Sequence, residues 1–115
     1  MTYWKRDAVK KLFSDLGAKI KEEPAMAGYY DLTSLYLTPK GSREWVRVVP
    51  FVTHPEGTRG IDDACEVEHV EVRTDGDDGG GLQSNNMEVC NLYNVVCIRL
   101  RKKGFDVVPC MDNYF

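Results

Sequence analysis

Side chains that could bind a metal ion or act as a nucleophile are few in this chain of 115 residues, which holds four cysteines and two histidines. Structural zinc sites bring their ligands together in tight pairs on a turn. Cys65 and His69 fall in a segment with strand composition, which would hold their side chains far apart. Cys90 and Cys97 are seven residues apart in a helical pattern. We therefore expect no metal or other cofactor, and interpret the helical cysteines as small buried thiols.

The loop Asp75–Gly81, DGDDGGG, has the acidic composition of a calcium-binding loop. If Asp75 were the first ligand of an EF-hand loop, the twelfth position would fall on Asn86, where such a site needs a bidentate glutamate. We expect a hydrated, exposed loop, with a weak cation site at residues 75–78 as the alternative.

Negative charge is concentrated in one part of the sequence. Residues 53–88 carry ten acidic residues and two arginines, whereas residues 1–52 carry nine Lys or Arg against six acids. A local negative field steers basic partners and speeds their encounter, although solubility alone would also explain it. We predict a partner-binding surface formed by Asp62, Asp63, Glu66, Glu68, Glu71, Asp75, Asp77 and Asp78.

Residues 90–107, CNLYNVVCIRLRKKGFDV, resemble the catalytic helix of papain-fold toxin domains, in which a cysteine lies near the start and a basic end precedes a Gly-aromatic-Asp-Val strand. In register on Gly104, the family's cysteine falls on Asn91, one residue from Cys90. The histidine that the family places downstream is missing, because both histidines of this chain lie upstream. A nucleophilic cysteine needs such a base, so we do not expect catalysis by Cys90.

The PD-(D/E)xK nuclease core has the order helix, three strands, helix and strand, and the expected pattern of this chain is similar to it. The resemblance implies a divalent ion held by an Asp on the second strand and by Glu-x-Lys on the third. Asp31 begins a predicted strand, but the following strand starts with Glu44 and has no lysine two positions later. Glu71 is followed two positions later by Arg73. A divergent nuclease using Asp31 and Glu44, with Glu71 as a third candidate, is the enzymatic alternative.

The clearest structural element is a helix over residues 85–103 that leads into a strand at 105–108. Asn85 and Glu88 have the spacing of a capping box, and Gly104 is placed to end the helix. An apolar stripe at helical spacing predicts its buried face: Val89, Tyr93, Val96 and Leu100.

The remaining pattern predicts a helix over residues 2–16, a strand at 18–22, a hairpin over 29–52 with its turn at 39–42, and a strand at 66–74. The chain is thus expected to form a single α+β domain over residues 1–115, in the order α-β-β-β-β-α-β. Its two helices would pack on a mostly antiparallel sheet of four to five strands.

The sequence has no run of the roughly 18 apolar residues that a membrane-spanning helix needs. Its start, MTYWKRDAVKK, also lacks the apolar stretch of a signal peptide. We expect an intracellular, cytoplasmic protein, including the case of a viral protein in its host cell.

Basic residues on the two predicted helices form a second candidate binding surface. They would meet nucleic-acid phosphates if the two helices lie side by side. The residues concerned are Lys5, Arg6, Lys10, Lys11, Arg99, Arg101, Lys102 and Lys103.

The absence of a complete catalytic set favours a protein that acts by binding. The acidic surface predicts a small protein-binding or inhibitor protein of the type that phages and mobile elements encode, in the manner of anti-CRISPR or nuclease-blocking proteins. Its partner would be a basic protein surface, such as that of a nucleic-acid-processing complex. The aromatic residues Tyr36, Trp45, Tyr114 and Phe115 could either leave an exposed apolar patch or complete the core.

Overall fold

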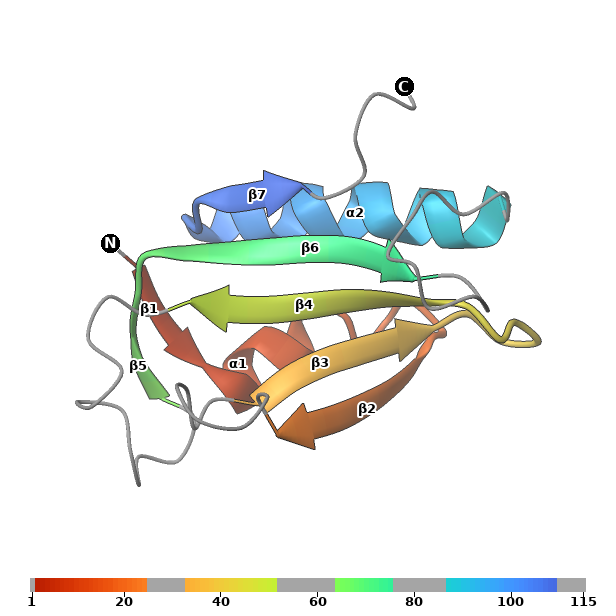
Figure 1. Ribbon diagram of the computed structural model, residues 1–115, viewed down its shortest axis with the longest axis horizontal. Helices are drawn as coiled ribbons and strands as arrows, with labels where there is room; N and C mark the ends of the chain where they lie inside the picture. The colour runs from red at the N-terminus through yellow and green to blue at the C-terminus, as the bar shows by residue number, and fades with distance from the viewer. Residues whose placement is uncertain (1, 25–32, 52–63, 76–86, 110–115) are drawn as a thin grey trace.

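The computed structural model describes residues 2–24, 33–51, 64–75 and 87–109. They form nine elements, shown in Figure 1. In chain order these are β1 (Thr2–Lys5), α1 (Arg6–Lys11), β2 (Lys19–Pro24), β3 (Thr33–Thr38), β4 (Trp45–Phe51), β5 (Ala64–Val67), β6 (His69–Asp75), α2 (Met87–Lys103) and β7 (Val107–Pro109).

Five of the strands form one sheet in the order β2-β3-β4-β6-β7, antiparallel except for the parallel pair β6–β7. Both helices lie on the same side of this sheet (Figure 1), and α2 contacts β4, β6 and β7. The core lies between the helices and the sheet, where valine and leucine side chains of β3, β4 and β6 are fully buried. The predicted α+β fold, with two helices on a mostly antiparallel sheet, is confirmed.

The long helix α2 agrees with the sequence pattern. All four residues of the predicted stripe are buried, and Gly104 has a φ of 105°. The Gly104 amide donates to the Arg101 carbonyl at 3.0 Å, and the Phe105 amide donates to the Leu100 carbonyl at 3.1 Å. These two bonds form a Schellman motif, which turns the chain toward β7. Asn85, the predicted capping residue, lies outside the described residues.

The predicted helix over residues 2–16 is wrong at its start. Thr2–Lys5 is strand β1, which pairs with β5 in a separate two-stranded sheet. Helix α1 is only six residues long, and residues 12–16 continue it as turns. Trp4 is fully buried, as an apolar residue of either element would be, but Ala8 is exposed. Pairing with a distant strand overrides the local helical pattern here.

The predicted strand at 66–74 is two strands, β5 and β6, which join different sheets. Val67 and Val70 are both buried although they are three residues apart, so the strict alternation of one strand is broken at Glu68. Figure 1 shows the chain turning sharply there. With β1 and β5 added, the observed order is β-α-β-β-β-β-β-α-β.

The hairpin and the first sheet strand agree with prediction. The β3–β4 turn is closed by the Ser42 amide, which donates to the Pro39 carbonyl at 3.0 Å, and Gly41 has a φ of 82°. Such a conformation strains a residue that has a Cβ atom, so glycine suits this position. Pro24 ends β2, as expected.

Arg99 connects α2 to the turns after α1 by hydrogen bonds. Its guanidinium donates to the Leu12 carbonyl at 2.7 Å and forms a bidentate contact with the Asp15 carboxylate, with an Nη2–Oδ2 distance of 3.1 Å. The hydrogen bond from Arg99 is the main reason that the pKa of Asp15 lies below its ordinary value. Neither helix of the described residues is long and apolar enough to span a membrane.

Candidate binding face of the sheet

The sheet face turned away from α1 and α2, here called the outer face, carries an unusual set of side chains. Along β4 the residues alternate between fully buried and partly exposed, and Val46 and Val48 point into the core. Their neighbours therefore point outward. The described outer-face side chains include Lys19, Lys21, Tyr36, Thr38, Trp45, Arg47, Phe51, His69, Glu71 and Arg73.

One row of this face crosses four adjacent strands in register. Lys21 on β2 pairs with Tyr36 on β3, Tyr36 pairs with Arg47 on β4, and Arg47 pairs with Arg73 on β6. Neighbouring strands lie about 4.8 Å apart, so the row is about 14 Å long. Three of its four members carry a positive charge, and we call it the transverse row.

The two arginines of the transverse row lie directly opposite each other, an arrangement that disfavours folding because like charges repel across the strand pair. The Nε atoms of both are buried and have no hydrogen-bond partner among the described residues. Among the described side chains, the Glu71 carboxylate lies near Arg73, with an Nη1–Oε1 distance of 3.6 Å. The sheet thus places two guanidinium groups side by side, and each has an Nε–H donor without a partner among the described residues. Such unused donors are typical of a site that binds an anion.

Aromatic rings lie beside the arginines at one end of β4. The Tyr36 and Trp45 rings are 5.8 Å apart at 56°, and the Arg47 Cζ atom lies 5.3 Å from the centre of the Tyr36 ring. At the other end of β4, the Phe51 and His69 rings stack at 4.8 Å and 13°. Aromatic rings thus lie at both ends of β4 on the outer face, with Arg47 between them.

A pocket of about 550 Å³ opens at the Trp45 end of the outer face. Its walls combine lysine, arginine, hydroxyl and aromatic side chains from two strands, the β3–β4 turn and the start of β4. The lining residues are Lys19, Lys21, Tyr36, Thr38, Ser42, Arg43 and Trp45. Among the described side chains of the outer face, Lys19, Lys21, Arg47 and Arg73 outnumber Glu71, the one carboxylate described there.

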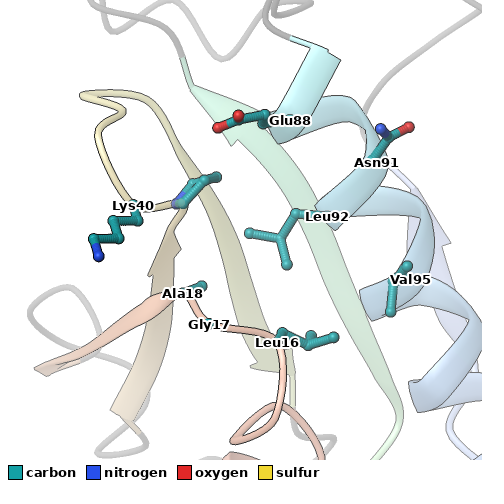
Figure 2. A pocket seen from close by; sticks show the side chains of 9 residues that line it. Leu16, Gly17, Ala18, Lys40, Glu88, Asn91, Leu92 and Val95 are labelled. Atoms are coloured by element: carbon teal, nitrogen blue, oxygen red, sulfur yellow. The ribbon is translucent and has the colours of Figure 1, made fainter.

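A second hollow of about 410 Å³ lies on the helix side, between α2, the α1–β2 loop and the β3–β4 turn. Figure 2 shows Leu92 pointing from α2 toward Leu16 and Ala18, while the Lys40 side chain points away from the helix. Asn91, which stands at the cysteine position of the papain-fold resemblance, also lines it. This groove is mainly apolar.

Neither cysteine of α2 is prepared to act as a nucleophile. Burial raises the pKa of the Cys90 thiol, and the charge of Glu44 raises it further. Burial also raises the pKa of Cys97. Both therefore stay protonated at neutral pH, whereas the thiolate is the attacking form.

Four members of the predicted acidic surface lie within the described residues. Glu66 and Glu68 are exposed at the two-stranded sheet, Glu71 lies on the outer face beside Arg73, and Asp75 ends β6 in register with Trp45. Glu66 thus lies in the two-stranded sheet and Glu71 and Asp75 in the five-stranded sheet, with Glu68 at the bend between β5 and β6. Asp62, Asp63, Asp77 and Asp78 lie outside the described residues, and so does most of the predicted calcium loop.

The two described carboxylates of the nuclease alternative lie on opposite sides of the sheet. Glu44 lies near Cys90 on the helix side, whereas Glu71 lies on the outer face, and Asp31 falls outside the described residues. His69 stacks on Phe51 instead of approaching the cysteines of α2. Within the described residues, no group of three or more His, Cys, Asp or Glu side chains is placed to hold a metal ion.

The basic helix faces are partly engaged in ion pairs. Arg6 and Lys10 of α1 contact the Glu22 carboxylate of β2 at 3.0 and 3.4 Å, and Arg99 contacts Asp15. Within the described residues, at least three of the eight predicted cations thus have carboxylate partners. Lys102 and Lys103 are exposed at the end of α2.

The pairing of Arg47 with Arg73 was missed by the sequence prediction. A local signal did exist, because Trp45, Arg47 and Phe51 alternate with core residues and so belong to one exposed face. The register that places Arg73 opposite Arg47 has no such local signal.

Comparison with protein-family models, with curated proteins and with solved structures finds no match for this chain.

Proposed function

We propose that this protein acts by binding and that its outer face holds single-stranded nucleic acid. The transverse row carries the proposal, because it aligns three cations and an aromatic ring across four strands. Arginine suits phosphate recognition, since its planar fork donates two parallel hydrogen bonds to phosphate oxygens.

The mixture of rings and cations favours a single strand over a duplex. Unpaired bases stack on aromatic side chains while basic side chains follow the phosphates, and a sheet surface is a common platform for this. Tyr36 and Trp45 lie at one end of β4, and Phe51 and His69 at the other. Six residue steps along the strand separate Trp45 from Phe51, a distance of about 20 Å. A duplex would hide its base faces from these rings.

Two matched lysine pairs test this surface against the helix surface. Lys19→Gln with Lys21→Gln removes two exposed cations from β2, and Lys102→Gln with Lys103→Gln removes two exposed cations from the end of α2. Removing one phosphate interaction costs about fivefold in affinity for a single strand at 0.1 M salt, so we expect about 25-fold weaker binding for the β2 pair. The measurement is fluorescence anisotropy of a labelled 12-nucleotide RNA or DNA, with a duplex of equal length beside it.

The salt dependence of the same titration measures independently how many phosphates the protein neutralises. The slope of log affinity against log salt should become shallower by about 0.7 for each phosphate that the β2 variant no longer binds. The α2 pair should keep both the affinity and the slope of the wild type. Loss of binding in the Lys102→Gln with Lys103→Gln variant alone would place the binding site on the helices. Wild-type affinity in the Lys19→Gln with Lys21→Gln variant would contradict binding at the outer face.

A second candidate surface is the two-stranded sheet, here called the β1–β5 ribbon, which retains part of the acidic prediction. Tyr3 is 59% exposed and is in register with the exposed Glu66. The side chain of Glu68, immediately after β5, is 60% exposed. An exposed aromatic side chain beside carboxylates favours a basic protein partner.

The ribbon predicts a protein complex that weakens with salt. Glu66→Gln with Glu68→Gln should reduce capture of a basic partner protein in a pull-down at low salt. The β2 lysine pair is the control and should leave this capture unchanged. Capture that persists in high salt, or in the Glu66→Gln with Glu68→Gln variant, would eliminate the electrostatic surface.

A further inference from the structure

The pocket at the Trp45 end of the outer face has the composition of a site for a flat, polar ring. Its volume of about 550 Å³ falls within the range of small-molecule sites. The Tyr36 and Trp45 rings meet at 56° and so form two walls of a corner. The Thr38 hydroxyl and the lysine ammonium groups of β2 add hydrogen-bonding groups around it.

Trp45 offers the larger ring of this corner to a stacked base. The guanidinium of Arg47 lies 5.3 Å from the centre of the Tyr36 ring, which is a cation–π contact. Trp45 is partly exposed and lines the pocket, whereas the other tryptophan of the chain, Trp4, is fully buried. A base stacked on Trp45 would lie next to Arg43 and the lysines of β2.

The arginine pair lies one outward-facing position further along the sheet. Trp45 and Arg47 are alternate residues of β4, so their Cα atoms are about 6–7 Å apart along the strand. Arg73 stands opposite Arg47. A base bound in the pocket and a phosphate bound at the arginine pair would thus be separated by about 6–7 Å along β4.

We infer that the pocket is a nucleobase site and that the Arg47–Arg73 pair receives a phosphate of the same strand. This rests on the proposed function and adds to it the place of the base and of the phosphate. Recognition is by stacking and charge, and every base has a π face, so the site accepts different bases. The bound group is a nucleotide unit within a single strand.

The two tryptophans allow a direct test by fluorescence. Oligothymidine of 12 nucleotides, titrated into the wild type, should quench the emission of Trp45 and leave that of Trp4. In Trp45→Phe the quenching should disappear while anisotropy still reports binding, because phenylalanine retains a ring for stacking. Trp45→Ala should bind about 5- to 140-fold more weakly, which corresponds to the loss of one base–aromatic stack. Tyr3→Ala, which removes an exposed ring from the β1–β5 ribbon, is the control and should bind as the wild type does.

The outcomes separate the pocket from the general proposal. Binding by anisotropy without quenching, or with full affinity in Trp45→Ala, overturns the nucleobase pocket and leaves single-strand binding in place. Absence of binding in the wild type removes the proposed function itself. Quenching that survives in Trp45→Phe would show that the signal comes from Trp4, and would also overturn the pocket.

Discussion

Replacing Trp4 with alanine is expected to lower the free energy of unfolding by about 3–5 kcal/mol, the usual cost of truncating a large buried aromatic residue. Trp4 is fully buried and meets the Phe105 ring edge to face, with centroids 6.0 Å apart. It therefore joins β1 to the segment that follows α2. Domains of this size are stable by about 5–15 kcal/mol, so the loss takes a large part of the total. Urea denaturation followed by far-UV circular dichroism measures it.

Trp4→Phe is the matched control for this substitution. The Trp4 Nε1 atom is buried and has no hydrogen-bond partner among the described residues, so losing it removes no bond within them. Phenylalanine keeps the edge-to-face contact in part, and we expect less than half of the alanine effect. A loss below about 1 kcal/mol in Trp4→Ala would contradict the burial of this residue.

Changing Arg47 and Arg73 together to threonine is expected to weaken binding of single-stranded nucleic acid about 100-fold or more. A hydrogen bond to a charged group contributes about 1.5–3 kcal/mol, and each guanidinium is placed to donate at least one. The stability should respond differently. Relief of the repulsion between opposed arginines adds about 0.2–1 kcal/mol, and loss of the cation–π contact on Tyr36 removes a similar amount.

The free energy of unfolding should therefore stay within about 1 kcal/mol of the wild type. Threonine suits a strand, so the variant keeps the local backbone preference. Anisotropy and urea denaturation on the same samples check both parts. Wild-type affinity in the double variant would show that the two arginines do not contact the bound strand. A collapse in stability would instead identify them as structural residues.

The part of the fold that the sequence predicted best is the part whose cause is local. The stripe from Val89 to Leu100 and the stop at Gly104 lie within one helix and its cap, and both are as expected. The β3–β4 turn is similar, since Gly41 supplies the conformation that the turn needs. Such features need no knowledge of distant contacts.

The errors come from pairings between distant residues. Residues 2–5 have a helical pattern, but they form a strand because Ala64–Val67 is there to pair with them. The arginine pair of the outer face was missed for the same reason, because it depends on a pairing between distant residues. Arg47 alone is an ordinary exposed strand residue, and only the β4–β6 register places Arg73 opposite it. The acidic residues lie within one segment of the sequence and so give a local signal, whereas the outer-face cations come from separate strands and give none.

The contact between Trp4 and Phe105 also constrains how the protein folds while it is being made. A chain leaves the ribosome from its N-terminus, so β1 emerges before its strand partner β5 and before Phe105. Until those segments follow, the Trp4 indole lacks the partners that bury it. Strand β1 is thus synthesised early but fixed late, and the core around Trp4 is completed only after α2 has been synthesised.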